Sequence, residues 1–153
     1  MIIRRAELTD IDPIYAIGAE CFANIWSVES VDHDIRNVEL TTYYVAEIKG
    51  IIAGFGGLWA VADEGQVTNI AVREKYRRQG CGELLVRALL ESSWRKGLAT
   101  VFLEVRWSNE AARQLYEKLG FSVLGTRKAY YDNPTENGYI MACSQANYQR
   151  IQV

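Results

Sequence analysis

The turn Arg77-x-x-Gly80-x-Gly82 has residue types and spacing suited to binding an anion. It follows a strand-like segment and precedes a long amphipathic one, so both glycines fall where a helix is expected to begin. The first N–H groups of a helix have no partner within it and carry partial positive charge, and glycine lets a phosphate approach them closely. Four basic side chains add charge nearby: Arg73, Lys75, Arg77 and Arg78. We therefore predict a cradle for a diphosphate group.

The residues of this turn also fit other interpretations. No Gly-Lys-Ser/Thr follows, so the turn is not a P-loop, and no third glycine stands where the dinucleotide fingerprint requires one. A basic, solvated loop in which Gly80 and Gly82 merely permit the chain to reverse has the same local sequence. Evidence for a ligand has to come from the elements around the turn.

Hydrophobic periodicity gives those elements. Residues 66–72 have a strand pattern, and Leu84, Leu85, Ala88 and Leu89 form the apolar stripe of the helix after the turn. Asp12 is expected to cap an earlier helix that begins at Pro13, and Lys49-Gly50 indicates a hairpin. The other strands expected are 2–4, 43–48, 51–59, 100–105, 121–127 and 139–143, and the other helices expected are 28–37 and one from Asn109 to Gly120. The order βααβββαβαββ mixes hairpins with helical crossovers, which predicts a mixed sheet.

Composition and charge narrow the class of protein. The length of 153 residues suits one domain over 1–153, and 49% hydrophobic with 24% charged residues is ordinary for a globular protein. The formal charge of −2 argues against direct nucleic-acid binding. Cys21, Cys81 and Cys143 are widely spaced, which favours neither a disulfide framework nor a zinc site and fits a cytoplasmic protein. No run of 18 apolar residues is present, so no membrane span is expected.

With the strand before it and the helix after it, Arg77-Arg78-Gln79-Gly80-Cys81-Gly82 resembles the coenzyme A motif R/Q-x-x-G-x-G/A of the GCN5-related N-acetyltransferase (GNAT) superfamily. Within it, the sequence is similar to the ribosomal-protein-alanine N-acetyltransferases, the RimI type. The motifs that carry this similarity are Glu20-Cys21-Phe22, Trp26-Ser27, Asn69-Ile70-Ala71-Val72, Leu103-Glu104-Val105-Arg106, Ser108-Asn109-x-Ala111-Ala112, Leu115-Tyr116-x-x-x-Gly120-Phe121 and Arg127-Lys128-x-Tyr130-Tyr131.

The resemblance implies an α/β (α+β) GNAT fold. We expect a mixed, twisted seven-stranded sheet, splayed at strands 4 and 5 and flanked by about four helices, with acetyl-CoA as the acetyl donor and no metal. A bulge in the fourth strand is expected to free backbone N–H groups for the thioester. The residues implied to bind the cofactor are Ile70, Ala71, Val72, Arg77, Arg78, Gln79, Gly80, Cys81, Gly82, Asn109 and Tyr116.

The same resemblance implies two proton-transfer residues. Glu104 is the expected base for the acceptor amine, acting directly or through a water, and Tyr116 is the expected acid for the departing thiolate. On the residues alone, Glu104 also fits a solvated strand end, and Tyr116 also fits a core tyrosine on the stripe of its helix. Asn109 is expected to cap that helix, to touch the cofactor, or both.

The acceptor side is expected to include Trp26, Tyr130 and Tyr131. The two tyrosines equally fit a pair of sheet aromatics. Asp32-His33-Asp34 contains the only histidine, and without a second cluster it fits a solvated helix face rather than a metal site.

The function implied is acetylation of the N-terminal alanine of a small-subunit ribosomal protein, by direct attack in a ternary complex. Two alternatives stay open at this point. One is acetylation of another amine, such as a lysine or a small metabolite, and the other is a non-catalytic acyl-CoA sensor.

Overall fold

The structure is a computed structural model that describes residues 1–22, 27–131 and 134–152. Seven strands form one sheet in the order β1-β2-β3-β4-β5-β7-β6. The strands are β1 (Ile2–Arg5), β2 (Thr41–Ile48), β3 (Ile51–Val61), β4 (Glu64–Val72), β5 (Thr100–Arg106), β6 (Ser122–Tyr131) and β7 (Glu136–Ser144). The helices are α1 (Ile11–Cys21), α2 (Val28–Arg36), α3 (Cys81–Arg95), α4 (Glu110–Lys118) and α5 (Gln145–Ile151), with short 3₁₀ turns η1 (Leu8–Asp10) and η2 (Glu74–Tyr76).

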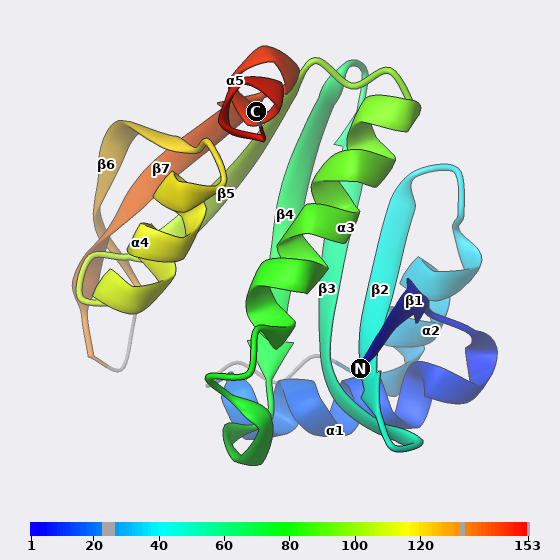
Figure 1. The fold of residues 1–153 in the computed structure, drawn as a ribbon. Coiled ribbons are helices and arrows are strands. Elements are labelled where there is room, and N and C mark those ends of the chain that lie inside the picture. Colours follow the sequence, from blue (N-terminus) through cyan, green and yellow to red (C-terminus); the bar gives the residue numbers. More distant parts are fainter. Residues whose placement is uncertain (23–26, 132–133, 153) are drawn as a thin grey trace.

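The sheet splits at its centre, between β4 and β5. These two strands run parallel, and they pair only from Glu64 with Thr100 to Gln66 with Phe102. Every other neighbouring pair is antiparallel. Beyond Gln66 the strands diverge, and Figure 1 shows β5, β6 and β7 standing apart from β4. The expected mixed sheet, splayed at strands 4 and 5, is confirmed.

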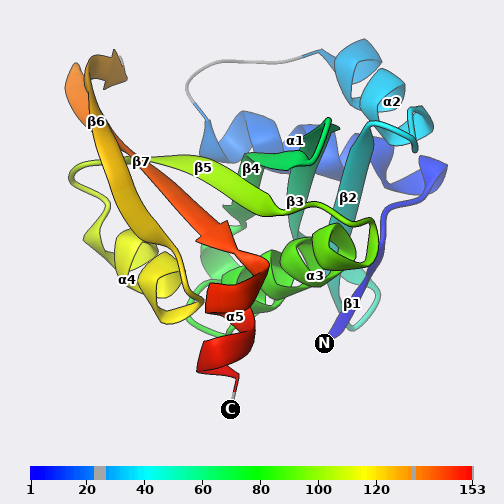
Figure 2. The same ribbon diagram turned by 90° about the horizontal axis from the view of Figure 1, so that it is seen from above.

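Helices cover both faces of the sheet. Seen from above, α1 and α2 lie on one side, and α3, α4 and α5 lie on the other (Figure 2). The α1/α2 side packs around Ile14, Ile17, Val31, Phe55 and Ala71. The opposite side packs α3 and α4 against the split sheet, and its fully buried residues include Leu89, Leu90, Val101, Leu119 and Met141. Alternation along each strand therefore assigns every side chain to one of two distinct faces.

Local sequence patterns predicted some boundaries of helices and strands correctly and others incorrectly. The Lys49-Gly50 hairpin is confirmed, with φ of 50° and 78° as a two-residue turn between right-twisted strands requires. The expected cap at Asp12 is wrong, because α1 already begins at Ile11, directly after η1. Helix α5 was not predicted. Ser144 caps it by accepting from the N–H of Asn147 at 3.1 Å, and Tyr148 buries it against the core.

Candidate active site

The predicted anion turn lies at the N-terminus of α3. Gly80 precedes the helix with a φ of 86°, a region in which glycine is not strained. Arg78 also adopts a positive φ, 64°, which costs a residue with a Cβ about 1–2 kcal/mol. Such strain concentrates at functional turns. The turn directs the first N–H groups of α3 outward, which is the arrangement that binds a phosphate.

A cavity of about 620 Å³ opens in front of this turn. Its wall is built by the ends of α1 and β4, the beginning of α3 and one side of α4. Its lining residues are Cys21, Phe22, Ile70, Ala71, Val72, Arg77, Arg78, Gly80, Cys81, Gly82, Glu83, Asn109, Ala111, Ala112, Leu115 and Tyr116. The fold therefore brings the residues expected to bind the cofactor together, apart from Gln79, which lies in the same turn but not among the lining residues described.

The turn leaves room for a ligand to approach the backbone. A Cβ built on Gly80 would meet no atom within 4 Å, and one on Gly82 would meet only Leu115, at 3.7 Å. Two of the nearby basic residues have protein partners: Arg73 pairs with Glu20 at 3.2 Å, and the Arg77 Nε donates to the carbonyl of Val72 at 2.9 Å. Of the four basic residues, Arg77 and Arg78 line the cavity, and Arg73 and Lys75 are not among the lining residues. The exposed turn and Arg78 fit a diphosphate.

The open edge of β4 forms the floor of the cavity. The pairing register with β3 shifts between Gly57 and Leu58, which leaves Thr68 as an extra residue and confirms the expected bulge. Beyond the bulge, the Val72 carbonyl points away from β3, where it accepts from Arg77. Because alternate residues of a strand point to the same edge, the N–H groups of Ile70 and Val72 face the cavity. Ala71 pairs toward β3 and packs its side chain with the α1/α2 core.

Tyr116 and Asn109 join this cavity from α4. Tyr116 is 8% exposed and packs against Phe121, with 5.7 Å between ring centroids. Burial raises the pKa of Tyr116 to about 12. Asn109 caps α4, as predicted, since its Oδ1 accepts from the N–H of Ala112 at 3.2 Å. Tyr116 is therefore both a core residue and part of the cavity wall, so the two interpretations of the sequence are compatible.

Glu104 lies on the other face of β5. Val101, Leu103 and Val105 turn toward α3 and α4, so Phe102 and Glu104 face the α1/α2 side. The Glu104 carboxylate lies 3.5 Å from the Arg127 Nε. A hydrogen bond from the Tyr130 hydroxyl to Glu104 raises the pKa of Tyr130. Glu104 is half-buried and lies on the α1/α2 side of the split.

Tyr130 and Tyr131 surround Glu104. Their rings meet edge to face at 4.9 Å between centroids, and Arg106 lies over Tyr131 at 4.6 Å. Burial, followed by the charge of Glu104, raises the pKa of Tyr131 to about 12, and Tyr116 interacts with the same hydroxyl. The β6–β7 register shifts between Arg127 and Tyr131. Both tyrosines lie in this irregular stretch, and both interact with Glu104.

Sequence reasoning missed part of this arrangement. Arg127, which pairs with Glu104, was noted only as part of a motif, and Cys21 and Phe22 were not expected on the cofactor wall. No sequence pattern places Cys21 and Phe22 on this wall, because only the tertiary fold brings the end of α1 beside β4. The predicted acceptor residue Trp26 lies outside the described residues. Within the described ranges, no group of three or more His, Cys, Asp or Glu could hold a metal, and no helix is long and apolar enough to cross a membrane.

A split mixed sheet, a glycine turn at a helix N-terminus and a tyrosine on the cavity wall define the class of coenzyme A-dependent acyltransferases that the sequence resembles. The acetyltransferase (GNAT) family model matches residues 11–121. The chain belongs to this family.

Individual relatives are similar to this chain over most of its length. A Bacillus subtilis relative is 40% identical over 139 residues, covering 91% of this chain and 92% of its own length. The ribosomal protein bS18-alanine N-acetyltransferase of Escherichia coli K12 is 37% identical over 140 residues, covering 89% of both chains. A crystal structure of the E. coli ribosomal-protein-S18-alanine N-acetyltransferase superposes with a TM-score of 0.84 at 35% identity, covering 94% of this chain and 92% of that one.

Proposed function

We propose that the chain, as one domain over residues 1–153, transfers an acetyl group from acetyl-CoA to the N-terminal alanine amine of a small-subunit ribosomal protein. The observation that carries the proposal is the split between β4 and β5, with the phosphate turn and Tyr116 on one side and Glu104 on the other. The two substrates would meet across the sheet. Three free cysteines are compatible with action in the cytoplasm.

The cavity supports acetyl-CoA as the donor. The N–H groups of the turn around Gly80 and Gly82 would hold the diphosphate, with Arg78 nearby. The open edge of β4 would hold the pantetheine arm, as a strand pairs with an extended chain. The bound thioester supplies an activated acetyl carbonyl. Asn109 and Leu115 would close the side formed by α4.

Glu104 is placed to deprotonate the acceptor amine. A protein α-amine has a reference pKa near 7.7–8.0, so a carboxylate needs to remove only one weakly held proton near neutrality. Glu104 accepts from Tyr130 and pairs with Arg127, two contacts that fix the position of its carboxylate. Tyr130 and Tyr131 would then form walls for the first residue of the acceptor.

Backbone and phenol would stabilise the other charges. The N–H groups of Ile70 and Val72 face the place where negative charge would develop on the acetyl oxygen, and such donors contribute about 3–4 kcal/mol in well-studied enzymes. The Tyr116 hydroxyl would donate to the sulfur as the thiolate leaves. The amine proton would go to Glu104 and the thiol proton would come from Tyr116, so the charges balance.

The choice of acceptor rests on the relatives, since the E. coli proteins that match along nearly the whole chain act, by their names, on the alanine of bS18.

The test is release of coenzyme A by the purified protein, with acetyl-CoA and a panel of acceptors: alanine-starting peptides, the same peptides with a blocked N-terminus, a lysine peptide and small amines. We expect turnover only with free N-terminal alanine. Turnover of lysine or small amines alone would contradict the acceptor, and no release with any amine would contradict the enzyme.

A matched variant tests the base. Glu104→Gln keeps the shape of the side chain but not its basicity, so turnover should fall by roughly 10²-fold or more. Glu117→Gln, on the exposed face of α4, makes the same change in net charge and should leave turnover unchanged. Equal activity of the Glu104 and Glu117 variants would remove Glu104 from the mechanism.

A further inference from the structure

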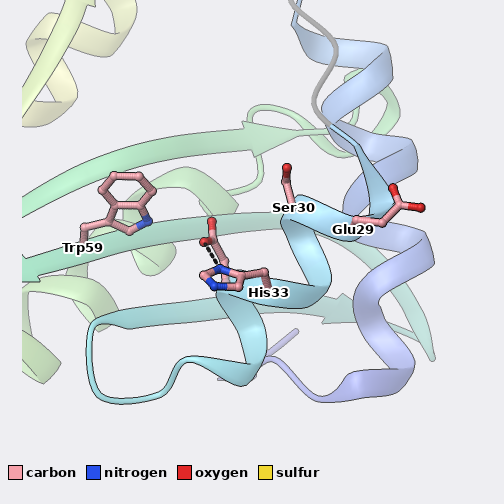
Figure 3. A pocket seen from close by; sticks show the side chains of 5 residues that line it. Glu29, Ser30, His33 and Trp59 are labelled. Atoms are coloured by element: carbon pink, nitrogen blue, oxygen red, sulfur yellow. Dashed lines mark ion pairs between the residues drawn. The ribbon is translucent and has the colours of Figure 1, made fainter.

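A second cavity, of about 400 Å³, lies between α2 and β3, away from the cofactor cavity. It is lined by Glu29, Ser30, His33, Asp34 and Trp59. In Figure 3 the Trp59 indole stands on its strand and faces the turn of α2 that carries Ser30 and His33, while Glu29 lies toward the outer side of the helix. Trp59 is 47% exposed, so part of its indole is open to a ligand.

The walls of this cavity combine negative charge with an aromatic face. Asp34 accepts from the Tyr43 hydroxyl at 2.9 Å, and the charge of Asp34 adds to burial in raising the pKa of Tyr43. Glu29 stands in the first turn of α2 with its carboxylate turned away from the indole, so Asp34 is the carboxylate nearer to Trp59. The His33 Nδ1 lies 3.7 Å from the Asp34 carboxylate, and no Lys or Arg is among the lining residues. A cation over an indole and beside a carboxylate gains from both contacts. The chemistry selects a guanidinium or an ammonium group.

The cavity shares a face of the sheet with Glu104. Trp59 pairs with Gln66 on β4, and Gln66 pairs with Phe102 on β5. Directly paired residues project to the same face, so these three side chains form a row that ends two residues from Glu104. Phe55 lies four residues before Trp59 on β3, so the two side chains project to the same face of the sheet. Phe55 packs with residues of α1 and α2, which identifies this face as the α1/α2 side. The row thus connects the two sites across the α1/α2 face.

Strand geometry gives the separation. Two strand spacings and a step of two residues along β5, beyond the last β4–β5 pair, place the backbone of Trp59 about 12–16 Å from that of Glu104. An extended chain of about four residues covers this distance. A polypeptide whose amine lies at Glu104 therefore reaches the cavity within its first several residues.

We propose that this cavity binds a basic side chain of the acceptor polypeptide, an arginine or a lysine located about four residues after the acetylated amine. The inference rests on the proposed function and adds to it a requirement on the acceptor sequence. Charge complementarity, the exposed indole and the row of paired residues each point to this occupant.

The experiment compares three alanine-starting peptides with the whole chain: one with arginines at positions 3 to 6, one with those arginines replaced by glutamine, and a tripeptide too short to reach Trp59. Binding is measured by calorimetry with coenzyme A present, and turnover by release of coenzyme A. We expect the arginine peptide to have a KM and a Kd about tenfold below those of the glutamine peptide, at similar kcat. Equal constants for the two long peptides would overturn the proposal.

Substitutions in the second cavity test whether the preference for the arginine peptide arises there. Trp59→Ala and Asp34→Asn should each raise the KM of the arginine peptide several-fold and leave that of the tripeptide unchanged, and the amide in Asp34→Asn can still accept from the Tyr43 hydroxyl. Val61→Ala, an exposed position on the same strand, and Glu117→Gln are the matched controls. An arginine preference that survives in Trp59→Ala would place the basic side chain elsewhere and overturn the assignment. If the wild type binds the arginine peptide more tightly but acetylates no peptide, the proposed function fails while the binding site stands.

Discussion

The hydroxyl of Tyr116 is protonated at any pH near neutrality, because burial raises its pKa to about 12. A thiol such as that of cysteine has a pKa near 8.5, so complete proton transfer from the phenol to the thiolate is uphill by about three to four pKa units. In the proposed mechanism, therefore, Tyr116 donates a hydrogen bond as negative charge develops on sulfur. Its proton would pass to sulfur only as the proton released by the amine replaces it.

Tyr116→Phe removes this donor and keeps the ring against Phe121. We expect kcat to fall by roughly 10²-fold or more, with little change in the affinity for acetyl-CoA. Because the hydroxyl is neutral at pH 7 and at pH 9, the factor should be the same at both values, which steady-state kinetics will show. Tyr148→Phe, a second buried tyrosine that donates to Glu91, is the control and should leave kcat unchanged. A loss restricted to high pH would contradict the assigned state.

For single residues, the sequence predicted which residues belong to the candidate site better than it predicted the side chains that contact them. Alternation along 100–105 places Glu104 opposite Val101 and Leu103, and the structure has that arrangement. The same alternation carries no information about Arg127, which lies on another strand. Tyr116 was ambiguous because a helical stripe marks burial, and the cavity wall on α4 is formed by the same stripe.

Among the elements, the turn before α3 depends on two glycines for different reasons. Gly80 has a φ of 86°, so Gly80→Ala should lower the stability by about 1 kcal/mol and weaken coenzyme A binding by distorting the N–H groups. A Cβ on Gly82 makes only an ordinary contact, so Gly82→Ala should leave the stability nearly unchanged. Urea denaturation of both variants, with calorimetry of coenzyme A binding, separates the two effects. Equal stability losses would contradict the assigned backbone geometry.

The start of the chain is fastened by a buried ion pair. Asp10 is 3% exposed, and its carboxylate accepts from Arg4 at 2.7 Å and from the N–H of Glu7 at 2.7 Å. Burial by itself raises the pKa of Asp10, but the bonds from Arg4 and Glu7 outweigh it, and the pKa is lowered below its usual value of 3.8. A lowered folded-state pKa means that the pair stabilises the fold above pH 3.8 and loses this effect as the pH falls through the folded-state value.

Asp10→Asn should therefore lower the free energy of unfolding by about 1–3 kcal/mol at pH 7. The difference from the wild type should shrink as the pH falls below 3.8, where the wild-type carboxyl becomes protonated as well. Denaturant titrations at pH 7, 4 and 3 measure this trend. Asp12→Asn, two residues away and exposed, is the control and should have a small effect at every pH. A difference that grows toward low pH would contradict the sign.

Elements with strong periodicity were predictable, and those set by tertiary contacts were not. The helix after the glycine turn and the Lys49-Gly50 hairpin follow from local chemistry. The bulge at Thr68 left no local signal, because residues 66–72 read as an uninterrupted strand, and its expectation came from the family resemblance. Helix α5 has seven residues, and an isolated helix of that length is unstable in water, so packing of Tyr148 rather than propensity holds it.

Over the whole molecule, the sheet is two antiparallel halves joined by three residue pairs between β4 and β5. A buried cluster holds them together on the α3 side, with Leu58 and Val67 from one half and Val101 and Leu103 from the other. The cofactor cavity extends along the same split, from Val72 on β4 to residues of α4. A ligand in it would contact both halves, so binding and folding should be coupled.

Coenzyme A should consequently stabilise the protein by mass action. At a concentration about a hundredfold above its Kd, a ligand that binds only the folded state adds about 2.7 kcal/mol, which for a chain of this size raises Tm by roughly 5–10 °C. Pantetheine, which lacks the diphosphate, should give a much smaller rise at the same concentration, and Gly80→Ala should reduce the rise with coenzyme A more than Gly82→Ala does. Thermal unfolding followed by circular dichroism measures the rise for the wild type with coenzyme A, for the wild type with pantetheine, and for each glycine variant with coenzyme A. Equal shifts with pantetheine and coenzyme A would mean that the turn at α3 does not bind the diphosphate, and the assignment of the cavity would have to be abandoned.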